Sequence, residues 1–162
     1  MLIASTHPGE DEIVLDAIAA LPDRPPIVLA PRHVERGPAI ADLAHARLSA
    51  SPRSRSREAA DILVADTLGE MGLWFRLAGT SVIAGSLVPD IGGHNPLEAA
   101  RLNCPRSAAR SSTIGPRPSR GWKPPQGVVM TSPDGLRDAL AADLADPAAA
   151  KAAPPAPAPS ST

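Results

Sequence analysis

Short apolar runs alternate with longer amphipathic stretches along most of this chain. Residues 2–5 predict a buried strand, and residues 10–20 predict a helix with Ile13, Ala17 and Ala20 on one face. Further apolar runs predict strands at residues 27–30, 61–65, 82–84 and 128–130.

Helices are predicted between and after these strands. They run through Ile40, Leu43, Ala44 and Leu48, and over residues 71–78, 95–102 and 133–144. Ser132 is expected to cap the last helix. Strands that alternate with helices indicate an α/β fold, here a Rossmann-like parallel sheet with helices on both faces.

Residues 106–126 break the alternation, because they show neither period where a strand and a helix start are expected. Codons can be chosen for this stretch so that a two-base shift of the reading frame, beginning inside the Arg106 codon, encodes VRGPIVDNWAAAFTGMEAA. That string contains the missing strand, a Gly-Pro turn and an amphipathic helix. We hypothesise two compensating frameshifts near Arg106 and Gln126, with a natural basic loop as the alternative. Resequencing the gene across this stretch distinguishes the two.

Composition sets limits on the class of protein. The 162 residues, 43% of them apolar, suffice for one domain with one core, expected over residues 1–146. The Ala/Pro-rich residues 147–162 are expected to be disordered. A net charge of -1 gives no reason to expect nucleic-acid binding, and the single cysteine excludes an internal disulfide. No apolar run approaches the ~18 residues of a membrane span.

Residues 85–98 carry the strongest functional signal. The segment contains a glycine pair and ends at Asn95-Pro96, where Asn can cap a helix and Pro can occupy its first position. Glycines allow close approach of the backbone to a ligand, and free N–H groups at a helix start attract an anion. A strand, a glycine-rich loop and a helix start are how open α/β sheets hold nucleotides.

Four loops follow the first four strands and would line one edge of the sheet, at residues 6–10, 31–33, 66–70 and 92–98. Together they contain one Arg, three His, four Gly and three Glu. Arg32 is the natural bidentate partner for a phosphate, and a Glu facing the same cleft can accept hydrogen bonds from two ribose hydroxyls. A nucleotide-linked donor is therefore expected. The histidines His7, His33 and His94 lack the close spacing of metal ligands, so capping of turns or contact with phosphate is the favoured reading.

Taken together, the four loops resemble the C-terminal domain of the 3-deoxy-D-manno-octulosonic acid (Kdo) transferases, which are GT-B glycosyltransferases of lipid A assembly. The matching motifs are residues 6–12 (THPGEDE), 30–33 (APRH), 65–72 (ADTLGEMG), 85–88 (GSLV) and 92–98 (GGHNPLE). The resemblance covers roughly residues 2–105 and resumes from residue 127 to about residue 146.

This resemblance implies a CMP-Kdo donor, an acceptor such as tetraacyl lipid IV(A), and neither metal nor cofactor. Nine positions would contact CMP, namely Pro31, Arg32, Leu68, Gly69, Glu70, Asn95, Pro96, Leu97 and Glu98. His7 is a further candidate for the phosphate. Arg32 and the two helix starts would hold the phosphate, and Glu98 would face the ribose.

In this family the N-terminal half carries the membrane anchor, the acceptor groove and the catalytic glutamate. The chain begins with a strand of the C-terminal domain, so it is expected to be a donor-binding half that is inactive and unanchored by itself. Its family works at the cytoplasmic face of the bacterial inner membrane. Two alternatives remain open: the donor half of another GT-B enzyme, such as a nucleotide-sugar epimerase, and a non-catalytic binding module or pseudogene product.

Overall fold

The protein is built around one six-stranded sheet in which every pair of neighbouring strands is parallel. The computed structural model describes residues 1–48, 62–92, 94, 99, 101, 102, 104, 107–109 and 128–146. The strands are β1 (Leu2–Thr6), β2 (Ile27–Pro31), β3 (Ile62–Val64), β4 (Ser81–Ile83), β5 (Ser107–Ala109) and β6 (Val128–Met130). Their order is β3-β2-β1-β4-β5-β6, which is the Rossmann order, so the predicted fold class is confirmed.

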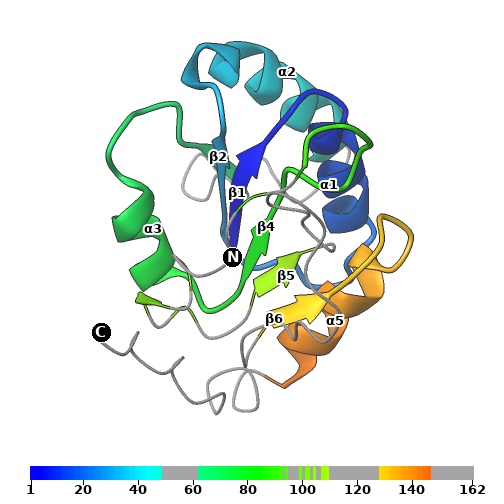
Figure 1. Ribbon diagram of the computed structural model, residues 1–162. Coiled ribbons are helices and arrows are strands. Elements are labelled where there is room, and N and C mark those ends of the chain that lie inside the picture. The colour runs from blue at the N-terminus through cyan, green and yellow to red at the C-terminus, as the bar shows by residue number, and fades with distance from the viewer. Residues whose placement is uncertain are drawn as a thin grey trace.

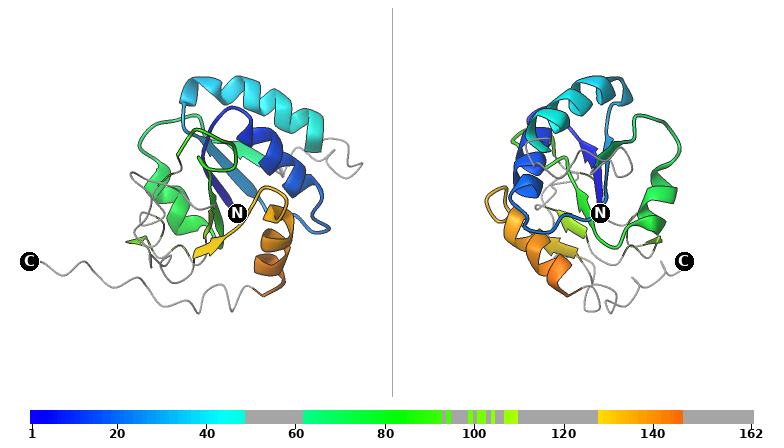
Figure 2. Two further views of the ribbon diagram at one scale, coloured as in Figure 1. Left: turned by 45° about the vertical axis from the view of Figure 1, so that its right-hand side comes forward. Right: turned by 180° about the vertical axis from the view of Figure 1, so that it is seen from behind.

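Helices cover both faces of the sheet. They are α1 (Glu10–Ala19), α2 (Gly37–Leu48), α3 (Met71–Leu77) and α5 (Leu136–Ala145), and a short 3-10 turn, η1 (Val34–Arg36), precedes α2. Figure 1 and both views of Figure 2 show α1 and α5 on one side of the sheet and α3 on the other. The crossovers carry helices to both faces, and β1, β2 and β4 are largely buried, whereas the edge strand β3 leaves Leu63 49% exposed.

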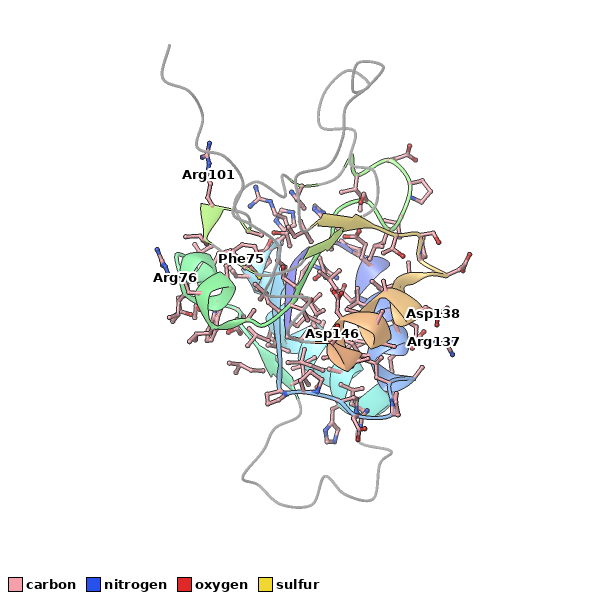
Figure 3. All side chains as sticks on the ribbon, turned by 90° about the horizontal axis from the view of Figure 1, so that it is seen from below. Phe75, Arg76, Arg101, Arg137, Asp138 and Asp146 are labelled. Carbon is pink, nitrogen blue, oxygen red and sulfur yellow. The ribbon has the colours of Figure 1, made fainter. Side chains whose placement is uncertain are left out.

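Successive residues of a strand pack into two separate apolar cores. Ile3 of β1 belongs to the core beneath α1, α2 and α5. Its neighbours Leu2 and Ala4 belong to the core beneath α3, together with Phe75. Figure 3 shows Phe75 on the sheet side of α3, whereas Arg76 points away from the sheet. The period of two along β1 therefore divides its side chains between the two layers.

Two expectations for the C-terminal third need correction. Residues 106–126 were expected to lack a strand, yet residues 107–109 form β5 between β4 and β6. Ladder hydrogen bonds are made by the main chain, and three residues are too few for a side-chain period to show. The remainder of that segment, residues 49–58 and the C-terminal tail lie outside the described residues.

The last helix begins at Leu136 and not at Pro133. The Ser132 hydroxyl accepts a hydrogen bond from the Gly135 N–H at 3.2 Å, so this side chain caps the turn that precedes the helix. Within the described part of the chain, no helix combines the length and apolarity needed to cross a bilayer.

Candidate functional site

The strand order reverses between β1 and β4, which places the loops that follow these two strands side by side. β2 and β3 lie on one side of β1 in the sheet, and β4, β5 and β6 lie on the other. In open α/β sheets, ligands bind at the carboxyl ends of the strands at such a switch point. Residues 7–9 after β1 and residues 84–94 after β4 are therefore the place to look for a site.

The Glu10 carboxylate joins these two loops. Its side chain is fully buried, and both oxygens accept hydrogen bonds from the Gly85 N–H, at 2.7 and 2.8 Å. The Leu87 N–H donates to Oε1 at 2.8 Å, and the His7 N–H donates to Oε2 at 2.9 Å. A buried carboxylate is tolerated only where such donors replace water. One side chain thus holds the main chain of both loops.

His7 and His94 meet above this carboxylate. Their Nε2 atoms are 2.9 Å apart, their ring centroids are 5.1 Å apart, and the ring planes differ by 13°. The ring centres are far apart although the two Nε2 atoms are close, so the rings meet at their Nε2 ends and do not overlap face to face. One ring must donate and the other accept, so the pair carries one proton between the two facing nitrogens. His33 approaches the edge of the His7 ring at a centroid distance of 5.8 Å.

Glycine at position 85 is required by this arrangement. Its φ is +95°, in the left-handed region, and a Cβ built there would collide with the His94 ring, 2.9 Å from Nε2. The absence of a side chain at Gly85 therefore lets the imidazole of His94 rest on the backbone that Glu10 holds.

Arg32 and Arg36 enter the site from the loop after β2, with different electrostatic environments. Arg36 forms an ion pair with the buried Asp11 carboxylate and also donates to the Thr6 carbonyl at 3.3 Å. The Arg32 main chain donates to the same carbonyl at 3.0 Å, while its side chain is exposed. Among the described residues, no carboxylate forms an ion pair with Arg32. Arg32 is thus the cation with capacity for an external anion.

The histidine pair resists protonation. Burial is the main cause that lowers the pKa of His7 below its ordinary value; the Glu10 carboxylate opposes it, and three nearby cationic groups add to it, namely His33, Arg32 and Arg36. Burial likewise lowers the pKa of His94, with His7 and Arg32 adding to the effect. Both rings are therefore biased toward the neutral form until an anion arrives.

Three of the expected CMP contacts lie further out along the same edge. Leu68, Gly69 and Glu70 follow β3, which is separated from β1 by β2. Leu68 is 82% exposed, Gly69 has a φ of +86°, and the Glu70 carboxylate accepts a hydrogen bond from the Thr67 hydroxyl. Among the described residues, none of these three contacts His7, Arg32 or His94 through a hydrogen bond or ion pair.

The remaining expected contacts are divided. Pro31 ends β2 and is buried beside the exposed Arg32. Residues 95–98, and with them the expected role of Glu98, lie outside the described residues. The helix expected over residues 95–102 is described only in part, with Ala99 and Arg101 helical. Within the part of the chain that the structure describes, no group of three or more His, Cys, Asp or Glu side chains could hold a metal ion.

Sequence reasoning missed the roles of two residues of the site. Glu10 was expected as one of three glutamates in the loops at the edge of the sheet, whereas its carboxylate accepts three main-chain N–H groups. The hydrogen bond from the His7 N–H is not that of a capping box, because Glu10 is the first residue of α1 and Gly9 is its N-cap. His94 was expected to cap a turn or contact phosphate, and its contact with His7, 87 residues away in the sequence, has no local signal.

The curated relatives of this chain share one activity. The chain is 34% identical over 152 residues to the 3-deoxy-D-manno-octulosonic acid transferase of Haemophilus influenzae, a match that covers 88% of this chain and 35% of the relative. It is 43% identical over 112 residues to the same enzyme of Rickettsia bellii, covering 64% of this chain and 26% of the relative. The chain thus spans about a third or less of the length of these relatives. No protein-family model matches it.

A solved structure matches nearly the whole chain. It is the crystal structure of the C-terminal CMP-Kdo binding domain of WaaA from Acinetobacter baumannii, with a TM-score of 0.70 and 24% identity. The match covers 93% of this chain and 82% of that domain, so the two share a fold. The resemblance to Kdo transferases that the loop motifs carry is confirmed.

The lowered pKa values predict a pH-dependent stability. Below the ordinary histidine value of about 6.5, the unfolded chain takes up protons that the folded pair rejects, so the free energy of unfolding falls as the pH is lowered through this region. His94→Gln removes one of the two imidazoles whose pKa is lowered in the folded chain. Urea unfolding at about pH 7.5 and about pH 5.5 should therefore show a smaller pH-dependent loss in this variant than in the wild type.

His45→Gln is the matched control, because His45 is exposed on α2. It should keep the wild-type loss. An equal loss in the wild type and in His94→Gln would contradict the assignment.

Proposed function

We propose that this chain is the donor-binding domain of a Kdo transferase and that it binds CMP-Kdo at the carboxyl ends of β1, β2, β3 and β4. One observation carries the proposal. Arg32 is exposed and has no ion-pair partner among the described residues, and its charge helps to lower the pKa of both His7 and His94 at the switch point of the sheet. The names of the curated relatives and of the structural neighbour support the same donor.

In this proposal Arg32 binds the phosphate of CMP through its guanidinium, which suits two phosphate oxygens at once. His7 and His94 stand beside it as further donors, and an arriving phosphate raises their pKa values and favours protonation. Glu98 takes the ribose hydroxyls. The other proposed CMP contacts are Pro31, Leu68, Gly69, Glu70, Asn95, Pro96 and Leu97.

The reaction of the whole protein is proposed to be an inverting transfer to an acceptor such as lipid IV(A). A carboxylate base takes the proton of an acceptor hydroxyl, the hydroxyl oxygen bonds to the anomeric carbon of Kdo, and the bond from that carbon to the CMP phosphate oxygen breaks. Arg32 and the histidines would stabilise the negative charge that develops on the departing phosphate. The base, the acceptor groove and the association with the cytoplasmic face of the inner membrane are proposed to reside in the part of these proteins that this chain does not match.

Binding of CMP tests the donor site. Calorimetric titration of the full chain should detect CMP, and Arg32→Ala should raise the dissociation constant by about tenfold or more, because hydrogen bonds to a charged group contribute roughly 1.5–3 kcal/mol. Arg76→Ala is the matched control, since Arg76 is exposed at the far end of α3 and points away from the sheet (Figure 3). Equal affinities of the wild type and Arg32→Ala would overturn the assignment of Arg32.

The same titration with UDP separates a CMP site from that of another GT-B donor domain. Cytosine has an amino donor at C4 and an acceptor at N3, uracil has an acceptor at C4 and a donor at N3, and a site matched to one base leaves polar groups unpaired with the other. CMP is therefore expected to bind at least about tenfold more tightly than UDP. A preference for UDP would favour the alternative class.

A transfer assay tests whether this chain is inactive without the part of the protein proposed to carry the base. The chain alone, supplied with CMP-Kdo and lipid IV(A), is expected to give no turnover, because the proposed base lies elsewhere. Product would be followed by mass spectrometry of the lipid. Turnover by the isolated chain would show that the base is among these residues.

A further inference from the structure

We propose that Glu10 is a positioning residue of the donor site, whose buried carboxylate fixes the loops after β1 and β4 at the separation at which His7 and His94 meet. That the ligand of this site is CMP rests on the proposed function. The geometric part of the proposal, that Glu10 brings the two imidazoles together, stands without it.

The hydrogen bonds of Glu10 reach both loops at the point where each leaves the sheet. The His7 N–H belongs to the first loop, and the Gly85 and Leu87 N–H groups belong to the second. Ladder bonds between β1 and β4 end one residue before Gly85, at the Ala84 N–H that donates to the Ala4 carbonyl at 2.9 Å. Beyond that bond, Glu10 continues the connection between the two segments with its side chain.

Each imidazole is placed by a main-chain group that Glu10 holds. The main-chain N–H of His7 itself donates to Glu10 Oε2, so this hydrogen bond holds the residue that carries the ring. The His94 ring lies against Gly85, whose N–H donates to both oxygens. A change in the position of the carboxylate therefore moves both supports, and the 2.9 Å distance between the two Nε2 atoms depends on it.

The position requires a carboxylate at the length of Glu. All three main-chain partners are donors, and a carboxylate offers only acceptors. The amide of Gln would turn an NH₂ group toward at least one N–H, leaving that donor unsatisfied. Asp, one methylene shorter, keeps the charge but withdraws the oxygens from the second loop.

The test compares Glu10→Gln with a buried carboxylate elsewhere in the full chain. Asp143 is 5% exposed and accepts a hydrogen bond from the Thr80 hydroxyl at 3.1 Å, next to the amino end of β4. Asp143→Asn therefore reports the loss of a buried carboxylate away from the site. Two readouts are used, the ¹⁵N imidazole NMR spectrum of His7 and His94, and the dissociation constant of CMP.

Glu10→Gln is expected to abolish the spectral signature of the hydrogen bond between His7 and His94 and to weaken CMP binding by about tenfold or more. Asp143→Asn should change neither readout, even where it lowers the midpoint of unfolding. An unchanged imidazole spectrum in Glu10→Gln would overturn the proposal, because a merely stabilising role would leave the pair in place. Intact CMP binding with a lost imidazole signature would overturn the part that concerns the donor.

Hydrogen exchange in the wild type decides the matter if Glu10→Gln does not fold. The amides of His7, Gly85 and Leu87 share one carboxylate, so they are expected to exchange at a common slow rate. Exchange of Gly85 and Leu87 much faster than His7 would overturn the proposal. Failure of the wild type to bind CMP contradicts the proposed function, while the imidazole spectrum still decides whether Glu10 positions the pair.

Discussion

The site depends on one buried carboxylate. Glu10 is inaccessible to solvent and is neutralised by no cation among the described side chains, so its charge is stabilised by three main-chain N–H groups. Leaving any one of these donors unpaired would cost roughly 1–3 kcal/mol, and they come from two loops that are about eighty residues apart in sequence. The loops after β1 and β4 are consequently one structural unit. The strand order makes them neighbours, and Glu10 sets their spacing.

The two arginines beside this unit differ in whether a carboxylate compensates their charge. Asp11 is buried and compensates Arg36, whereas Arg32 is exposed and has no carboxylate partner among the described residues. Burial is the main cause that lowers the pKa of both His7 and His94, and His7 adds to the effect on His94. The described part of the site therefore presents one cation without a carboxylate partner, Arg32, beside two imidazoles whose pKa values are lowered.

Much of the fold could be predicted from the sequence, because buried strands and amphipathic helices follow from the order of apolar residues. β5 could not, since its three residues owe their place to main-chain pairing with β4 and β6. Arg32 was predicted as a phosphate contact from residue type and loop position, and that role stays a prediction. The role of Glu10 and the contact between His7 and His94 were not, because they depend on a distance across the sheet that no local pattern encodes.

We propose that a cytidine nucleotide binds at the carboxyl ends of the strands around the switch point. A two-dimensional ¹H–¹⁵N NMR titration of the full chain with CMP tests this directly, because it maps binding residue by residue. The largest shift changes are expected on the amides of His7, Arg32 and Gly85. Changes gathered around Thr80 at the amino end of β4, or no changes at saturating CMP, would contradict it.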